Sequence, residues 1–321
     1  MRHRSILILL ALNLLISPLE ARVEKSGFKI IGYYSLRSAM SDFHKFPFNS
    51  VTHVNLYFLN PDSLGNFNQD LSALTPFIQK AHKKDVKVLF SIGGGSEHPY
   101  YHRLLRDENR ALLVQNIVSL ALKYDLDGID VDLEGRDIDA NYEAFVTELA
   151  SLLRGHQKII TSAIAVYYKD QFSDKVLSQY DFVNIMVYDR TGPWRPDIPG
   201  QHSSYENAVE DLEYFGKERN IPAGRMVLGV PFYGYGFGPE LTSRAKSMNY
   251  RQIVSEFKGS ERVDEWSMGE GYTIYYNGIP TIVKKTDLAR KKASGIMIWQ
   301  LAGDAKGSKS LLKAINRAAV K

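Results

Sequence analysis

Short apolar runs alternate with longer amphipathic stretches along most of the chain. In the stretch 107–124, Leu113, Ile117, Leu120 and Tyr124 recur at helical spacing and form one apolar face. We predict helices over 71–83, 107–124, 141–154 and 207–219. We predict strands near 29–34, 51–58, 86–91, 128–132, 160–165, 182–188, 226–231 and 295–299.

This alternation predicts a (β/α)8 barrel, the TIM-barrel fold. A doubly wound open sheet is the alternative, and it would place a Gly-rich phosphate loop after the first strand. The segment Gly32-Tyr33-Tyr34 is not such a loop. A chain of 321 residues can bury a large core, and we expect one domain over 22–321.

The interval between the seventh and eighth predicted strands is longer than one strand–helix unit needs. Within it, the apolar segments 272–276 and 279–283 flank Asn277-Gly278, which is a strong signal for a two-residue hairpin turn. We therefore predict a hairpin at this turn. It would belong to a small β-containing insertion over about 236–290 that walls the top of the barrel.

The N-terminus has the pattern of a secretory signal peptide. A basic segment at 2–4 precedes the apolar run 6–16, which Pro18 ends, and Ala21 offers a cleavage site. The run is short for a transmembrane helix, although an uncleaved N-terminal anchor is the alternative. We predict removal of 1–21 and an exported protein, secreted or periplasmic, with no membrane attachment after cleavage.

The composition excludes several classes of function. Basic and acidic residues are interspersed at a net charge of +4, which argues against a nucleic-acid-binding arm. The absence of cysteine excludes thiolate metal sites and cysteine nucleophiles. The 19 tyrosines fit a sugar-binding groove, or equally a tyrosine-rich surface. We expect a monomer with neither metal nor cofactor.

The segment 127–134, DGIDVDLE, combines acidic and apolar residues with a period of two. In a strand, Asp130, Asp132 and Glu134 share one face, which points into the barrel toward its C-terminal mouth. Crowded carboxylates raise the pKa of at least one member, a cost that general acid chemistry explains and folding does not. A solvated acidic turn or a divalent-metal loop is the alternative, but such loops lack regularly spaced Ile, Val and Leu. We predict Glu134 as a general acid.

The same segment fits the DxxDxDxE signature of family 18 glycoside hydrolases, the chitinase family, which the chain resembles. Two further segments are similar to family motifs: 91–94 to SxGG and 186–189 to MxYD. The segments 192–194, 229–234 and 295–299 also resemble the family.

The resemblance implies a retaining, substrate-assisted hydrolysis of glycosidic bonds, in which the 2-acetamido group of the substrate is the nucleophile. It implies that Glu134 protonates the glycosidic oxygen and then deprotonates water. Asp132 would accept a hydrogen bond from the acetamide N–H, and Asp130 would share a proton with Asp132. Tyr188 would donate to the acetamide carbonyl, whereas Asp127 would order the start of the strand.

The resemblance also implies a set of substrate-binding residues. Trp299 would form the floor beneath the sugar that is cleaved, and Trp194 a platform on the leaving-group side. Core packing is the alternative for the aromatic and apolar members of the set. The substrate-binding residues are Trp299, Asp189, Met186, Tyr33, Ser91, Phe58, Trp194 and Tyr233.

One position departs from the family pattern. Many relatives carry an arginine two residues after the Tyr of PFYG, where it can pair with the MxYD aspartate. Tyr235 occupies that position here, which leaves the support of Asp189 open.

The implied substrate is a β-1,4-linked N-acetylglucosamine polymer, chitin or a chito-oligosaccharide. Alternatives are an endo-β-N-acetylglucosaminidase acting on N-glycans and a peptidoglycan-directed hydrolase. A non-catalytic chitin-binding lectin is the alternative from another class. Lectin relatives typically lose the catalytic glutamate or its neighbouring aspartate, but Glu134 and Asp132 are both present.

Overall fold

The computed structural model describes residues 27–96, 98–239 and 246–320. The predicted signal peptide over 1–21 lies outside the described residues and stays a prediction. Within the described residues, no helix is both long enough and apolar enough to span a bilayer.

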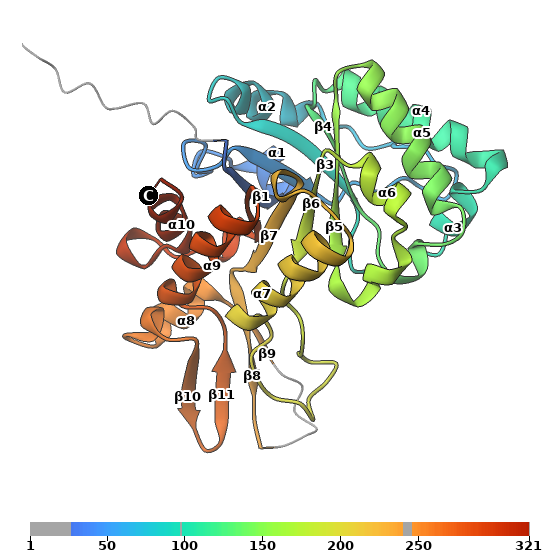
Figure 1. Cartoon of the computed structure of the whole chain (residues 1–321). Helices are drawn as coiled ribbons and strands as arrows, with labels where there is room; N and C mark the ends of the chain where they lie inside the picture. The colour runs from blue at the N-terminus through green and yellow to red at the C-terminus, as the bar shows by residue number, and fades with distance from the viewer. Residues whose placement is uncertain (1–26, 97, 240–245, 321) are drawn as a thin grey trace, which may run out of the picture.

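Eight parallel strands close into a barrel in the order β1-β12-β7-β6-β5-β4-β3-β2, which confirms the predicted fold (Figure 1). Each predicted strand matches one barrel strand, with ends that differ by a few residues. The barrel strands are β1 (Lys29–Ser35), β2 (His53–Tyr57), β3 (Lys87–Gly93), β4 (Gly128–Asp132), β5 (Ile159–Ala165), β6 (Phe182–Met186), β7 (Met226–Pro231) and β12 (Gly295–Trp299).

Helices cover the outside of the barrel (Figure 1). The predicted helix over 71–83 is split into a 3-10 turn, Ser72–Leu74, and α2, because Pro76 favours a fresh helix start. The predicted helix over 207–219 ends in a π turn, Tyr214–Glu218. The helices are α1 (Leu36–Ser41), α2 (Thr75–His82), α3 (Tyr101–Leu104), α4 (Asp107–Lys123), α5 (Tyr142–Gly155), α6 (Asp174–Gln179), α7 (Tyr205–Glu213), α8 (Tyr250–Glu256), α9 (Ile279–Lys292) and α10 (Leu311–Ala319).

The two faces of β4 belong to different layers of the molecule. Ile129 and Val131 are fully buried in the apolar layer between the strands and the helices. Asp130 lies on the opposite face, in register with Ser91 on β3 and Thr161 on β5. The alternation therefore places a polar layer inside the barrel, as the period of two predicts.

A four-stranded sheet lies between β7 and β12 in sequence and extends beyond one end of the barrel (Figure 1). This sheet confirms the β-containing insertion. Its strands follow the order β10-β11-β8-β9, which are β10 (Glu265–Gly269), β11 (Tyr272–Tyr275), β8 (Tyr233–Phe237) and β9 (Lys246–Asn249).

The predicted hairpin at Asn277-Gly278 is wrong. Gly278 is the N-cap of helix α9, with Pro280 in its first turn, so the segment 279–283 is helical. A Cβ on Gly278 would lie 2.3 Å from the carbonyl oxygen of Val263, so this glycine permits a close backbone approach. The actual hairpin joins β10 and β11 through Glu270-Gly271, whose φ angles of 50° and 79° fit a primed turn.

Candidate active site

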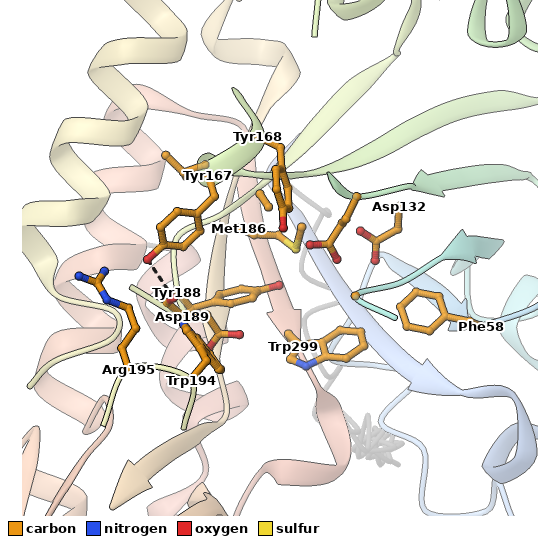
Figure 2. Close-up of a pocket in the computed structure, with 14 residues that line it drawn as sticks. Phe58, Asp132, Tyr167, Tyr168, Met186, Tyr188, Asp189, Trp194, Arg195 and Trp299 are labelled. Atoms are coloured by element: carbon orange, nitrogen blue, oxygen red, sulfur yellow. Dashed lines mark hydrogen bonds between the residues drawn. The ribbon is translucent and has the colours of Figure 1, made fainter. Parts of the chain in front are cut away.

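A cavity of about 630 Å³ opens at the C-terminal mouth of the barrel (Figure 2). Active sites of this fold lie at that end because the strand ends and following loops converge there. The cavity is lined by Phe58, Gly95, Asp132, Glu134, Ala165, Val166, Tyr167, Tyr168, Met186, Tyr188, Asp189, Trp194, Arg195 and Trp299. It therefore brings together eight of the twelve predicted site residues, and the other four lie behind its walls.

Asp130 is fully buried beneath the cavity, and four donors surround its carboxyl group. Its Oδ2 accepts hydrogen bonds from the hydroxyls of Tyr33 at 2.5 Å and Ser91 at 2.8 Å. Its Oδ1 accepts from Thr161 Oγ1 at 2.6 Å and Asn184 Nδ2 at 3.3 Å. Burial raises the pKa of Asp130, while the four donors act in the opposite direction. Tyr33 and Ser91 were expected to bind substrate. Here they donate to Asp130 instead, and neither is among the described residues that line the cavity.

Asp132 has very different surroundings. It is 3% exposed, and its Oδ1 has no hydrogen-bond partner among the described residues. Burial, followed by the charges of Glu134 and Asp130, raises its pKa well above the usual range. The donors named above occupy both oxygens of Asp130, and no hydrogen bond joins the two carboxyl groups in the described part of the chain. Proton sharing between Asp130 and Asp132 stays a prediction.

Glu134 follows the end of β4 at the cavity wall and is half-buried. Burial, together with the charges of Asp189 and Asp137, raises its pKa to about 7. A Cβ on Gly95 would lie 3.5 Å from Glu134 Oε1, so this glycine leaves room beside the carboxyl group. A carboxylic acid that keeps its proton near neutral pH is suited to donate it to a leaving group.

Tyr188 lies across the cavity from the acidic strand. Figure 2 shows its ring between Met186 and Trp299, with the hydroxyl directed toward the side that holds Asp132. Burial, followed by the charge of Asp132, raises the pKa of Tyr188 well above its usual value. Its phenol therefore remains a hydrogen-bond donor at physiological pH.

Asp189 adopts a left-handed backbone conformation, with a φ angle of 63°. Its Oδ1 accepts hydrogen bonds from the hydroxyls of Tyr233 at 2.5 Å and Tyr235 at 3.0 Å. The Nδ1 atom of His202 lies 3.3 Å from the same oxygen. Tyr235 thus supplies a neutral donor to Asp189 where many relatives would have an arginine. Tyr233 was expected to bind substrate. It donates to Asp189 from behind the cavity wall instead, and it is not among the described residues that line the cavity.

The comparisons with known proteins agree with this geometry. The model of the glycosyl hydrolases family 18 matches residues 29–304. This chain belongs to that family. Relatives in the family include both solved structures and curated sequences.

Two solved structures resemble the chain closely. The GH18 chitinase ChiB from the chitin utilization locus of Flavobacterium johnsoniae is 35% identical, with a TM-score of 0.81, and the match covers 91% of this chain and 94% of that one. A chitinase from Bacteroides thetaiotaomicron is 27% identical, with a TM-score of 0.76 over 92% of this chain and 97% of that one.

Two curated relatives match over part of their length. A chitinase-like effector of Moniliophthora roreri is 28% identical over 229 residues, which cover 60% of this chain and 55% of that one. The match to the endochitinase of Manduca sexta spans 41% of that protein. The chain therefore spans about half the length of these two relatives.

Aromatic residues form the remaining walls of this family 18 cavity. The ring of Trp299 lies 4.8 Å from that of Tyr57 and 5.7 Å from that of Phe58, measured between centroids. Trp194 is 54% exposed and contacts Tyr235 edge-on. Exposed aromatic faces at a cavity rim are suited to cover the C–H surfaces of sugars.

Several lining residues were missed by sequence reasoning. Tyr167 and Tyr168 follow the end of β5, and Arg195 follows Trp194. The two tyrosines could have been found by applying the strand-end argument to the fifth predicted strand as well as to the fourth. Arg195 had no such signal, because it lies inside an irregular loop. Within the described residues, no group of three or more His, Asp or Glu is arranged to hold a metal ion.

Proposed function

We propose that this chain is a chitinase that hydrolyses β-1,4-linked N-acetylglucosamine chains by a retaining, substrate-assisted mechanism. The observation that carries the proposal is the position of Glu134, a carboxyl group with a pKa of about 7, at the edge of an aromatic cavity that also holds Asp132 and Tyr188. The 35% identity to a chitinase over most of both chains supports a chitin-type substrate.

In the proposed reaction, the sugar ring packs on Trp299 and its acetamide group lies between Tyr188 and Asp132. The Tyr188 hydroxyl donates to the acetamide carbonyl. Asp132 accepts a hydrogen bond from the acetamide N–H, a role supported by its Oδ1, which is buried without a partner among the described residues. The buried aromatic surroundings strengthen both interactions because they exclude water.

Bond cleavage then needs one proton donor. Glu134 transfers its proton to the glycosidic oxygen, the bond from that oxygen to the anomeric carbon breaks, and the acetamide oxygen forms a bond to the same carbon. Water next attacks the anomeric carbon, gives a proton to Glu134 and releases the acetamide. Two inversions at one carbon retain its configuration.

The decisive experiment is product analysis with N-acetylchitohexaose. We expect shorter oligomers from the wild-type protein, and hydrolysis about 10²- to 10⁴-fold slower from Glu134→Gln, which keeps the shape of the side chain but cannot donate an acidic proton. Glu148→Gln on α5 is the matched control, since Glu148 pairs with Arg110 away from the cavity, and its activity should be unchanged. Hexaose binding by the wild type without cleavage would overturn the proposal in favour of a lectin.

A second substrate isolates the nucleophile. The hexamer of glucosamine carries free amines in place of acetamides and should not be cut. Its efficient cleavage would refute substrate assistance.

We also propose export of the protein, which rests on the pattern at residues 1–21. Detection of a chain that begins at residue 22 outside the producing cell is the corresponding test.

A further inference from the structure

A tight turn follows Glu134 and brings a second carboxyl group to the same cavity. The backbone N–H of Asp137 donates to the carbonyl oxygen of Glu134 at 3.1 Å, and Gly135 takes a φ angle of 56° that favours glycine. The side chain of Asp137 is buried as a result. Glu134 and Asp137 both line a cavity of about 430 Å³ that adjoins the first.

His98 holds Asp137 from the loop after β3, with Nδ1 3.0 Å from Asp137 Oδ2. The other ring nitrogen, Nε2, lies 3.2 Å from Nδ2 of Asn60. The Oδ1 of Asn60 accepts hydrogen bonds from Gly93 N at 2.6 Å and Tyr101 Oη at 2.7 Å, which identifies it as the oxygen. Nδ2 of Asn60 is therefore the donor to His98 Nε2.

This network determines where the proton of His98 lies. Because Nε2 accepts from Asn60, the single proton of a neutral ring is on Nδ1 and is donated to Asp137. An imidazolium ring would place its Nε2–H against the N–H of Asn60, donor against donor. The contact from His98 to Asp137 is therefore a hydrogen bond from a neutral group, and this contact does not itself cancel the negative charge of Asp137.

We propose that Asp137, held by neutral His98, is a positioning residue that keeps the catalytic proton on Glu134. The inference rests on the proposed function, since it assumes that Glu134 is the acid. Among the titratable and charged residues nearby, Asp132, Asp189, Tyr168 and Arg136 lie around Glu134, and Tyr100 and Tyr101 lie around Asp137. Asp137 acts through Glu134 and needs no contact with substrate.

The pH profile of kcat/KM on N-acetylchitohexaose tests this role. In Asp137→Asn, the loss of a nearby negative charge should move the alkaline limb about 0.5 to 1 pH unit lower. The activity at pH 8 then falls about threefold to tenfold more than the activity on the acid side. Asp137→Glu, which keeps the charge, should restore the wild-type limb. An unmoved limb in a folded Asp137→Asn protein would refute the proposal.

The chain offers a matched control at the other end of β4. Asp127 at the start of β4 also pairs with a histidine, at 2.9 Å between Asp127 Oδ2 and His82 Nε2, but at the opposite end of the barrel. Asp127→Asn should leave the alkaline limb in place. An equal shift in Asp127→Asn would mean that the effect is a general consequence of removing an acid, and would overturn the proposal.

Two more measurements distinguish a failure of the proposed function from a failure of the inference about Asp137. Carbon-13 NMR of the Glu134 carboxyl group reports its titration without turnover, and we expect a lower midpoint in Asp137→Asn. His98→Lys places a cation against Asp137 and should shift the midpoint in the same direction, which keeps the proposal testable if Asp137→Asn does not fold. An active Glu134→Gln variant would refute the proposed function, whereas an unchanged Glu134 midpoint in both variants would refute only the present inference.

Discussion

Asp130 and Asp132 lie two residues apart on the same face of β4, yet their carboxyl groups have opposite surroundings. Four side-chain donors from β1, β3, β5 and β6 converge on Asp130. Asp132 is almost equally buried, but its Oδ1 has no partner among the described residues. Depth inside the barrel therefore does not decide whether a carboxyl group is satisfied.

The difference follows from what lies above each residue. Asp130 is enclosed by neighbouring strands, so the fold itself must supply every hydrogen bond. Asp132 and Glu134 face the cavity, where a substrate can supply them. A buried acceptor left without a partner costs about 1–3 kcal/mol, and such costs are concentrated at functional sites. The fold thus satisfies the polar groups below Asp132 by itself, whereas the acceptors at the mouth are left for a ligand.

The largest expected effect on stability comes from removing the carboxyl group of Asp130, the satisfied member of the pair. Asp130→Ala would leave four buried donors without their acceptor, and we expect a loss of about 3–5 kcal/mol in the free energy of unfolding. Urea denaturation at pH 7 measures it. Asp130→Asn keeps the shape and one acceptor oxygen and should lose less. A loss below about 1 kcal/mol in Asp130→Ala would show that the donors find other partners.

At the cavity mouth, the raised pKa of Glu134 predicts that the free energy of unfolding depends on pH. The pKa of Glu134 is about 7 in the folded protein against the ordinary value of 4.5, so the folded state binds the proton more tightly. This contribution is fully present below pH 4.5 and is lost as the pH rises through 7. From pH 5 to pH 8, the wild type should therefore lose at most about 3 kcal/mol of unfolding free energy relative to Glu134→Gln.

Urea unfolding of both proteins at the two pH values checks this expectation. The control is again Glu148→Gln, whose carboxylate pairs with Arg110 of α4 away from the cavity. Its difference from the wild type should not follow the same trend. A constant difference between wild type and Glu134→Gln would contradict a raised pKa of Glu134.

Features that depend on a local periodicity of side chains could be predicted from the sequence. The period of two in 127–134 was enough to place Asp130, Asp132 and Glu134 on one face, because side-chain alternation is a local property of strands. The hairpin at Asn277-Gly278 failed for the opposite reason. The pair has the composition of a turn, but the close approach of Gly278 to Val263 and the helix start at Ile279 depend on contacts outside the pair.

Long-range partners were the other part that the sequence could not supply. Tyr235 donates to Asp189 across 46 positions, and His98 reaches Asp137 across 39. No local pattern marks either pair, because each depends on how loops from different strands meet at the barrel mouth. The prediction that Tyr233 binds substrate has the same origin. The sequence identified its segment, 229–234, but could not show which way the Tyr233 side chain points.

The smallest effect concerns the two tyrosines that support Asp189. Tyr233 lies 2.5 Å and Tyr235 3.0 Å from the same carboxylate oxygen. We expect kcat/KM on N-acetylchitohexaose to fall about tenfold in Tyr233→Phe and about threefold in Tyr235→Phe, since a typical hydrogen bond contributes about 0.5–1.5 kcal/mol and the longer one contributes less. Both substitutions keep the ring, including the contact of Tyr235 with Trp194.

The double variant shows whether the hydroxyls act as a unit. With one hydroxyl removed, the other still holds the oxygen, so removing both should reduce kcat/KM by more than the product of the single effects. Such coupling would mean that the two neutral donors together replace a cationic partner for Asp189. Independent effects would instead mean that each hydroxyl positions Asp189 on its own.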